Sequence, residues 1–495
     1  MQARCLLPVL LATSLAAHAA DEATLPALQA LAGDQARVSA LVVDLGSERT
    51  LASLEPKSRL TPASVSKLYA AAGALARWGP DHRFVNRVVS GGKVRDGKLA
   101  GDLMLIGAGD PGLDHSRLSL LASRLRQRGI ERVSGDLVIN DSLFGPVTCL
   151  TEDRCAARQV SENSYDAPLS AAGVNFSNVE VTIIPGREPD QPARLTLMPP
   201  GLEGFALRGD IATGEPDTRA AYWAWRATDG DLQTLHLAGV VPAGGGHFSL
   251  LRSVSEPSRY AGQVLKAVLA GQGIDVAGTV RVDHAPPDPD LVTLAEETSP
   301  TLANQLRDMM AYSNNYMADV LTLGLATEAD GPGPAQSGLA AASTMLAELG
   351  RRANAEAQPW LGAFPDDPPL TLTTGSGLSV DNRLSAADVV SLLAYMYRQP
   401  ALFPALIGSL PVPQYTPSRS VKNGNNDFAM RVAAKTGSLT EPVSVRAYAG
   451  YLRLKDGGWG AFAILINGTE AKPEIRFEDS MGAIREDLER ILAEY

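Results

Sequence analysis

A serine and a lysine three positions apart, Ser64 and Lys67, stand at the start of a segment with apolar periodicity. On a helix this spacing places both side chains on one face, one turn apart. Ser64 would lie in the first turn, where free backbone N–H groups and the positive helix end favour an oxyanion. A lysine can take the proton of a serine hydroxyl when burial or a neighbouring cation lowers its pKa. The pair therefore indicates nucleophilic acyl-transfer chemistry.

The spacing by itself also fits a simpler interpretation. An ordinary helix start, with Ser64 near the N-cap and Lys67 in solvent, uses the same residues. Ser90 and Lys93 repeat the spacing, but two glycines separate them after a strand-like segment, which predicts a turn. The interpretation of the first pair depends on other parts of the chain.

Two later stretches carry residue types that could complete such a site. Ser313 and Asn315 form a Ser-x-Asn within or beside a helix predicted at 302–323, and Lys435 begins a Lys-Thr-Gly that follows a strand-like segment. Such a strand can direct an ammonium and a hydroxyl into one cleft, and Gly437 lets a substrate backbone approach closely. Penicillin-binding proteins and class A β-lactamases carry this ordered set of three motifs. The set therefore favours a catalytic interpretation of the first pair.

Length and charge limit the class of protein. The 495 residues suffice for two or three domains, and the 45% of hydrophobic residues suffices for real cores. The formal net charge of -11 argues against nucleic acid and against an anionic membrane surface as partners. Peptides and small molecules remain as substrate classes.

The N-terminus has the pattern of a secretory signal peptide. Arg4 precedes an apolar run at 6–17 and a small-x-small sequence at 17–19. We expect export and cleavage after Ala19, so that residues 1–19 are the signal peptide. An apolar N-terminal helix is the alternative, but the run ends without a cap or an amphipathic face. No other stretch approaches 18 apolar residues, so we expect no transmembrane anchor.

The chain has three cysteines, of which Cys5 lies in the expected signal peptide. Export leaves Cys149 and Cys155 as an even pair in an oxidising compartment, and we predict a disulfide that closes a short surface loop. Two buried free thiols are the alternative. No histidine lies nearby, so the pair does not indicate a metal site.

The two ends of the chain predict one domain of helices and strands. A hairpin precedes the helix that begins at Ser64, and Ser385 with Asp388 makes a capping-box-like start for a later helix. The polar face of the C-terminal helix is rich in Asp and Glu, whereas interfacial helices favour Lys and Arg, so we expect this helix to pack on the sheet. The expected strands are 38–45, 50–54 and 459–466, and the expected helices are 25–32, 302–323, 339–349 and 386–397.

The middle of the chain has a different character. Residues 86–287 contain several strand-like runs separated by Pro- and Gly-rich turns, with one helix predicted at 116–128. We expect a β-rich insertion of two nested modules. The domain that carries the motifs then consists of residues 20–85 and 288–495.

At its three motifs the chain resembles the penicillin-recognising serine acyltransferases. It is most similar to the D-alanyl-D-alanine carboxypeptidase/endopeptidase family of penicillin-binding protein 4 type, peptidase family S13. In this family a large insertion separates the first two motifs, and here Ser313 follows Ser64 by 249 positions (313 minus 64). The resemblance spans nearly the whole mature chain and includes Gly109-Asp110-Pro111, Gly135-Asp136-Leu137-Val138, Asp141-Ser142, Gly375-Ser376-Gly377-Leu378-Ser379 and Asn382-Arg383-Leu384-Ser385.

The resemblance implies a multidomain α+β fold. A β-lactamase/DD-peptidase-like domain, with an antiparallel sheet flanked by helices, would carry the β-rich insertion. The implied activity is that of a periplasmic serine D-Ala-D-Ala carboxypeptidase, with DD-endopeptidase activity as a further expectation. Its expected partners are peptidoglycan stem peptides and β-lactams, which would inhibit it covalently. No metal or organic cofactor and no nucleic acid is implied, and the oligomeric state stays open.

The resemblance also implies roles for the first two motifs. Ser64 would attack the carbonyl of the penultimate D-alanine and form an acyl-enzyme, with Lys67 as the base. Ser313 would relay a proton towards the leaving amine. Asn315 would hold the acyl side chain or Lys67.

The third motif would bind the end of the substrate. Lys435 and Thr436 would bind its terminal carboxylate, and the N–H groups of Ser64 and Ser438 would form the oxyanion hole. Lys435 would also be the positive neighbour that keeps Lys67 neutral.

A carboxylate in the insertion is a candidate for substrate selection. Asp141 follows a strand and lies in one of the motifs that resemble the family. We expect it to pair with the free ammonium of diaminopimelate in the stem peptide, because an unpaired buried charge is costly. A strand-end Asp that caps a turn is the alternative.

Some features depart from the family or fit other functions. The region 413–418 lacks the Gly-x-Asp-Gly-Thr-Leu-like segment that often precedes Lys-Thr-Gly. Tyr312 and Asn314 also fit the Tyr-x-Asn of class C β-lactamases, but the insertion favours Ser313 and Asn315. A serine β-lactamase is the alternative enzyme, although no Glu is placed for the class A route. A non-catalytic peptidoglycan-binding protein is the alternative of another class.

Overall fold

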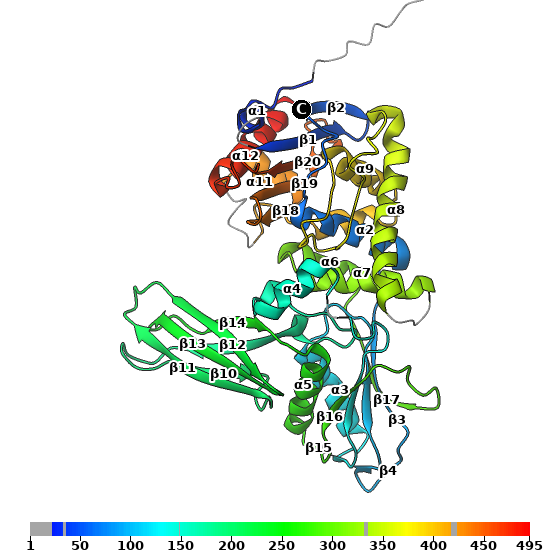
Figure 1. Ribbon diagram of the computed structural model, residues 1–495, viewed down its shortest axis with the longest axis vertical. Coiled ribbons are helices and arrows are strands. Elements are labelled where there is room, and N and C mark those ends of the chain that lie inside the picture. Colours follow the sequence, from blue (N-terminus) through cyan, green and yellow to red (C-terminus); the bar gives the residue numbers. More distant parts are fainter. Residues whose placement is uncertain (1–21, 33–35, 148, 331–334, 417–422) are drawn as a thin grey trace, which may run out of the picture.

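The computed structural model describes residues 22–32, 36–147, 149–330, 335–416 and 423–495. The signal peptide predicted at residues 1–19, with Cys5, lies outside the described residues. Figure 1 shows an upper part, built from both ends of the chain, and a lower part, built from its middle.

The upper part is organised around a five-stranded antiparallel sheet in the order β18-β19-β20-β1-β2. Because β1 pairs with β20, strands from the two ends of the chain lie side by side. β19 and β20 are buried along almost their whole length, since helices cover both faces. The strands are β1 (Arg37–Asp44), β2 (Arg49–Leu54), β18 (Val432–Leu439), β19 (Val445–Arg453) and β20 (Trp459–Asn467).

Alternate residues of the central strands enter two different cores. In β20, Ala463 and Leu465 pack on the side of α2 and α9, whereas Ile464 and Ile466 pack on the side of α1 and α12. The C-terminal helix buries its apolar stripe in the second core, as the sequence predicted. The helices are α1 (Pro26–Leu31), α2 (Lys67–Trp78), α9 (Ala386–Tyr397), α10 (Phe403–Ser409), α11 (Asn426–Arg431) and α12 (Phe477–Glu494).

The helix predicted at 302–323 is wrong as a single element. α6 (Leu302–Ala311) ends before Ser313, whose φ of 53° lies in the left-handed region, and α7 (Asn315–Asp330) begins after it. A right-handed helix cannot continue through a left-handed residue, so the Ser-x-Asn motif occupies a tight turn.

Two other helices follow the turn. α8 (Ala335–Leu361) is longer than the predicted 339–349, and α9 begins with the predicted capping box of Ser385 and Asp388. Within the described part of the chain, no helix is long and apolar enough to cross a membrane.

The lower part begins with a five-stranded sheet in the order β16-β8-β6-β3-β17. β3 and β17 pair antiparallel, with Val85 opposite Thr298, so the chain leaves this module beside the point where it enters. Closely spaced ends allow a module to be inserted without disturbing the domain that carries it. A small sheet, β15-β7-β5-β4, lies next to it. The elements are β3 (Val85–Ser90), β4 (Val94–Arg95), β5 (Lys98–Leu99), β6 (Leu103–Ile106), α3 (His115–Gln127), β7 (Arg132–Val133), β8 (Leu137–Asn140), α5 (Pro257–Gly271), β15 (Asp275–Val276), β16 (Val280–Asp283) and β17 (Val292–Thr298).

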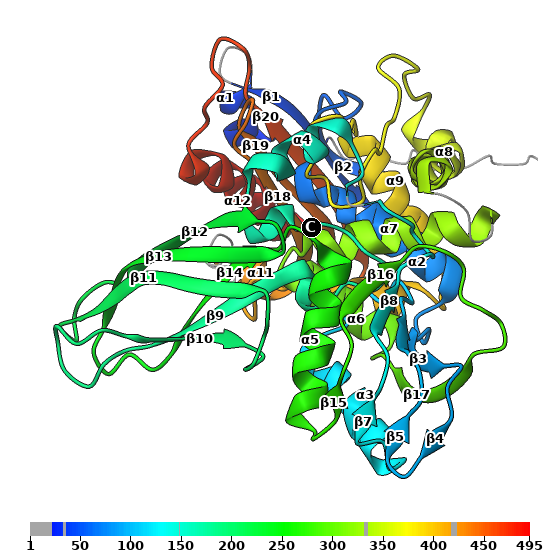
Figure 2. The same ribbon diagram turned by 60° about the horizontal axis from the view of Figure 1, so that its bottom comes forward.

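A second module is nested inside the first and extends away from the rest of the chain (Figures 1 and 2). It consists of two three-stranded sheets, β10-β9-β14 and β11-β13-β12, which share one apolar core. Its strands are β9 (Asn178–Ile184), β10 (Arg194–Met198), β11 (Phe205–Gly214), β12 (Ala221–Asp229), β13 (Leu232–Pro242) and β14 (Phe248–Ser253).

Candidate active site

Ser64 lies in a 3-10 turn, η1 (Ala63–Ser66), that leads directly into α2. Two glycines from other segments enclose this turn. A Cβ on Gly377 would lie 1.9 Å from the carbonyl oxygen of Ala63, and one on Gly437 would lie 3.1 Å from the nitrogen of Ser64. Glycine at these positions therefore lets two segments approach the backbone on either side of the serine.

Lys67 is fully buried and lies within hydrogen-bonding distance of three oxygens. Its Nζ is 3.0 Å from Ser64 Oγ, 2.7 Å from Asn315 Oδ1 and 2.8 Å from the carbonyl oxygen of Ser376. A neutral amine has two N–H donors and one lone pair. It can donate to the amide and carbonyl oxygens, which only accept, and accept the proton of the Ser64 hydroxyl.

Burial lowers the pKa of Lys67 from 10.5 to about 7, and the negative charge of Asp319 opposes this shift. The cause is that the buried ammonium loses its hydration, and among the described residues no carboxylate contacts it directly. A substantial fraction of Lys67 is therefore neutral at pH 7, which the role of a base requires.

Asn315 is the first residue of α7 and is oriented by the inserted region. Its Nδ2 donates to the carbonyl oxygen of Tyr165 at 3.2 Å, while its Oδ1 faces Lys67. A carbonyl oxygen accepts only, so this contact fixes the amide with its oxygen towards the lysine. Tyr165 belongs to a short 3-10 turn, η2 (Ser164–Asp166), and thereby links the insertion to the site.

Asp319 is a member of this site that the sequence reasoning missed. It lies one turn after Asn315 on α7, and its Oδ1 accepts the N–H of Ser376 at 2.8 Å, while the carbonyl of Ser376 accepts from Lys67. Burial raises the pKa of Asp319 to about 6, and the hydrogen bonds from Ser376 and the charge of Lys67 oppose the shift. Its spacing of four residues from Asn315 is the signal that could have identified it.

Lys435 lies on β18, the edge strand of the sheet, and is buried. Its Nζ donates to the carbonyl oxygen of Thr436 at 2.7 Å. Burial lowers the pKa of Lys435 well below 10.5, and the charge of Lys67 lowers it further. Burial is also the largest cause of the lowered pKa of Lys67, and the charge of Lys435 is not among its causes, so the electrostatics do not support the expectation that Lys435 keeps Lys67 neutral.

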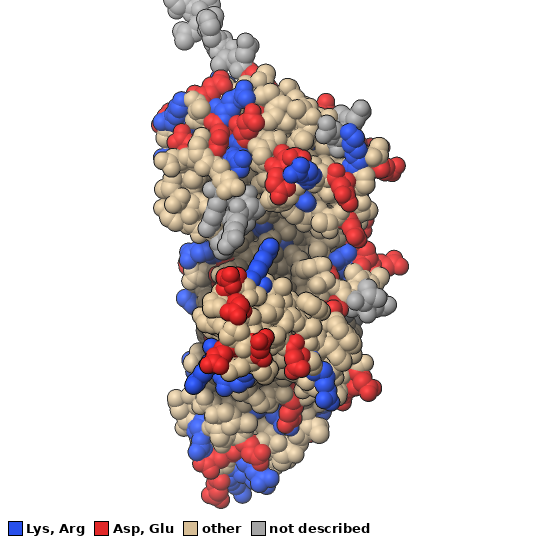
Figure 3. All heavy atoms as spheres, turned by 90° about the vertical axis from the view of Figure 1, so that its left-hand side faces the viewer, with Lys and Arg blue, Asp and Glu red and all other residues tan. Residues whose placement is uncertain are grey.

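The first half of β18 is wholly buried, and exposure alternates only from Lys435 to Ser438. Thr436 is half-buried and Ser438 is exposed, whereas Lys435 and Gly437 are buried. Ser313 occupies the turn between α6 and α7 and is half-buried. Figure 3 shows a hollow across the middle of one face of the molecule, between the part that carries the sheet and the inserted region.

The structure places Asp141 in the interior of the inserted region. Its Oδ1 lies 2.5 Å from Nδ1 of His284, and its Oδ2 accepts from the hydroxyl of Ser258. The side chain is buried, with 3% of the residue exposed. Both oxygens already have partners from this chain, which favours the structural interpretation over an ammonium-binding role.

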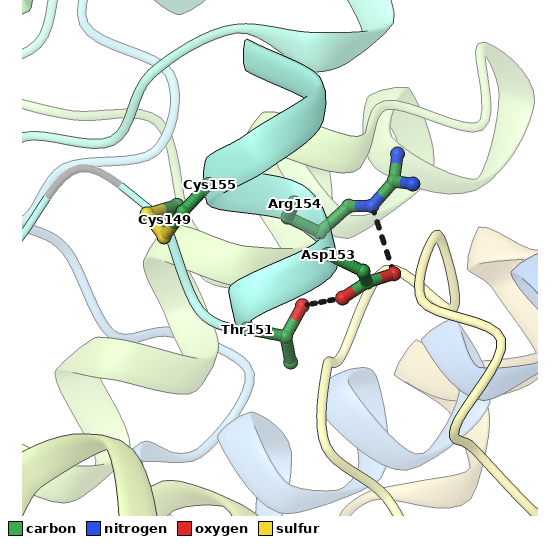
Figure 4. Close-up of a disulfide and its surroundings, with 5 residues drawn as sticks. All are labelled: Cys149, Thr151, Asp153, Arg154 and Cys155. Atoms are coloured by element: carbon green, nitrogen blue, oxygen red, sulfur yellow. Dashed lines mark hydrogen bonds and ion pairs between the residues drawn. A yellow bond between two sulfur atoms is a disulfide. The ribbon is translucent and has the colours of Figure 1, made fainter. Parts of the chain in front are cut away.

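Cys149 and Cys155 form the predicted disulfide. It closes the start of α4 (Glu152–Val160), and Figure 4 shows Asp153 and Arg154 on the side of this helix away from the sulfurs. The hydroxyl of Ser379 lies 3.4 Å from Oδ1 of Asp153, so α4 contacts the segment that includes the Ser376 partner of Lys67.

The second Ser-x-x-Lys pattern is a turn, as predicted. Ser90 is the last residue of β3, and its hydroxyl donates to the carbonyl of Asp102 and accepts the N–H of Gly92. A hydroxyl engaged in this way has no lysine partner to activate it.

A serine beside a buried lysine, on a helix packed against an antiparallel sheet, is the arrangement of the penicillin-recognising serine acyltransferases. The family model of the D-Ala-D-Ala carboxypeptidase 3 (S13) family matches residues 12–488. The chain therefore belongs to this family.

Individual relatives agree with this assignment. The chain is 31% identical over 471 residues to a D-alanyl-D-alanine carboxypeptidase of Actinomadura sp. (strain R39), covering 92% of this chain and 81% of that one. It is 24% identical over 458 residues to the D-alanyl-D-alanine carboxypeptidase DacB of Haemophilus influenzae, covering 90% of each. The crystal structure of penicillin binding protein 4 (dacB) from Haemophilus influenzae has the same fold, with a TM-score of 0.72 at 21% identity over 94% of this chain and 99% of that one.

Proposed function

We propose that this chain is a periplasmic serine D-Ala-D-Ala carboxypeptidase that acts on peptidoglycan stem peptides and is acylated by β-lactams. The observation that carries the proposal is the buried amine of Lys67, 3.0 Å from Ser64 Oγ and with a pKa lowered to about 7. Family membership supplies the substrate class.

In the acylation step, Ser64 Oγ attacks the carbonyl carbon of the penultimate D-alanine and its proton passes to Lys67 Nζ. The N–H groups of Ser64 and Ser438 stabilise the oxyanion, an effect typically of several kcal/mol. The C–N bond then breaks, and the leaving amine of the terminal D-alanine takes up a proton through Ser313. Asn315 holds Lys67 in place, as its 2.7 Å contact supports.

In the deacylation step, water attacks the ester and releases the shortened stem peptide, and the proton returns to Ser64. Before acylation, Lys435 and Thr436 bind the terminal carboxylate of the substrate, which departs with the terminal D-alanine. The same chemistry on a D-Ala–diaminopimelate cross-link would make the enzyme a DD-endopeptidase. Export follows from the signal peptide at residues 1–19, and a mature protein that begins at Ala20 is the expected result of N-terminal sequencing.

Labelling with a fluorescent penicillin tests the proposal. The wild-type chain should bind one penicillin covalently, Ser64→Ala should bind none, and the matched variant Ser90→Ala should label as the wild type. Labelling of Ser64→Ala would overturn the assignment of the nucleophile. Sustained nitrocefin turnover would favour a serine β-lactamase, and a wild type that does not label would favour a non-catalytic peptidoglycan-binding protein.

A further inference from the structure

The second nested module exposes two tryptophans on one face of one strand. Trp223 and Trp225 lie two residues apart on β12, and 56% and 50% of their surfaces are exposed. Residues two apart in a strand point to the same side, about 7 Å from each other along the strand. The chain has only five tryptophans, so two of them in solvent on one sheet face is a feature that packing does not explain.

The strands on one side of β12 place small and polar groups beside this pair. The ring of Trp225 stacks on His236, with the ring centres 3.8 Å apart and the planes 6° apart. In the paired strands, His236 is opposite Arg208, and Trp223 lies in a row with Ala238 and Asp210. Trp223, Trp225 and His236 therefore form one exposed aromatic surface. The small side chain of Ala238 leaves space beside Trp223.

The flanking charges are available for a ligand. Arg208 and Asp210 are exposed, and neither has an ion-pair partner among the residues that the structure describes. Both lie on β11, two residues apart, and offer five N–H donors and carboxylate acceptors along the side of His236 and Ala238 away from the tryptophans. We name the set of Trp223, Trp225, His236, Arg208 and Asp210 the aromatic platform.

We propose that the aromatic platform binds the glycan strand of peptidoglycan. A pyranose ring has an apolar C–H face that stacks on an indole and a rim of hydroxyl and amide groups that hydrogen-bond to charged side chains. The platform offers both within one sheet face. With its pair of opposite charges, it has no excess of Lys or Arg that would attract an anionic membrane.

The chemistry of the substrate indicates which ligand binds to the aromatic platform. The stem peptides that the proposed carboxypeptidase cleaves are covalently attached to a glycan polymer, so the polymer is present wherever the enzyme acts. The module extends away from the domain that carries the five-stranded sheet (Figures 1 and 2). Two weak sites on one polymer raise its effective affinity for the enzyme.

Binding to peptide-free glycan strands tests the proposal independently of the active site. The parent is the Ser64→Ala chain, the probes are amidase-treated glycan strands and N-acetylglucosamine oligomers, and the readout is titration calorimetry. The double variant Trp223→Ala/Trp225→Ala should bind at least tenfold more weakly. The matched control, Leu251→Ala, removes a side chain with 43% exposure from β14 in the other sheet and should bind as the parent.

In the catalytically intact chain, the double variant should keep wild-type penicillin labelling and kcat/KM for a soluble D-Ala-D-Ala peptide, and lose activity several-fold on intact sacculi. Equal glycan binding by the double variant and the parent would overturn the proposal. If glycan binding is unchanged but the double variant loses a concentration-dependent dimer in sedimentation, the platform binds a second copy of the chain instead. If glycan binding is unchanged but the double variant loses binding to anionic vesicles, the platform binds a membrane instead. A failure of penicillin labelling in the wild type would refute the proposed function, and the measurement of glycan binding would still stand on its own.

Discussion

The buried amine of Lys67 should make acylation of Ser64 depend steeply on pH near neutrality. With the pKa lowered from 10.5 to about 7, about half of the amine is neutral at pH 7. At the unperturbed value the neutral fraction would be about one in 3,000, because each pH unit changes the ratio tenfold. Since the neutral amine is the base, the acylation rate should rise about fivefold from pH 6 to pH 7 and level off above about pH 8.

Asp319→Asn is the perturbation that tests this reasoning. The variant removes the charge that raises the pKa of Lys67 and keeps an oxygen that can accept the N–H of Ser376. The midpoint of the pH profile should therefore move to lower pH, while the plateau rate changes little. A purely structural role for Asp319 would lower the plateau and leave the midpoint in place.

The assay is stopped-flow acylation by a penicillin between pH 5 and pH 9, at concentrations that give the second-order rate. The carboxylate of the penicillin stays ionised in this range, so the profile reports the enzyme. Arg154 and Asp166 line the same small hollow as Asp319, and Arg154→Ala serves as the control for a change of charge outside the direct contacts of Lys67. A midpoint that stays in place or rises in Asp319→Asn would refute the electrostatic reasoning.

Four further outcomes follow from the structure. Lys67→Met should raise the free energy of unfolding at pH 7 by up to roughly 4 kcal/mol, because burying the lysine with a lowered pKa destabilises the wild type. This destabilisation is fully present below pH 7 and vanishes as the pH rises towards 10.5. Chemical denaturation at pH 6 and pH 10 measures the difference, and a variant less stable than the wild type at pH 6 would contradict the prediction. Lys435→Ala should lose most acylation by carboxylate-bearing substrates through loss of the anchor, and wild-type rates with such substrates would show that the anchor lies elsewhere. Asp141→Ala should lower Tm and leave penicillin acylation unchanged, since its oxygens bind His284 and Ser258; a selective loss of kcat/KM for peptides with a free diaminopimelate amine would restore its role in substrate binding. Thiol titration of the unfolded, unreduced protein should find no free Cys149 or Cys155, and two free thiols would count against the disulfide.

The three motifs were readable in the sequence because each is local. Ser64 and Lys67 are one turn apart on any helix, and Lys435 and Gly437 point to the same side of any strand. The capping box of Ser385 and Asp388 likewise depends only on the order of residues in one helix turn. Local spacing is preserved on folding, so chemistry and element types could be predicted from it.

The conformation of the second motif was decided by the tertiary structure. Helical periodicity continues through Ser313, yet its left-handed backbone ends α6 and turns Asn315 towards Lys67. Helix propensity is a weak preference, and the contacts of a packed site can override it at a single residue.

The electrostatics of the site also needed the folded chain. The pKa of Lys67 is lowered because the fold buries its amine against Asn315 and Ser376, which are 248 and 309 positions away. The partners of Asp141 likewise come from distant segments and changed its interpretation. A pKa depends on hydration and on charges in space, and neither is encoded by spacing along the chain.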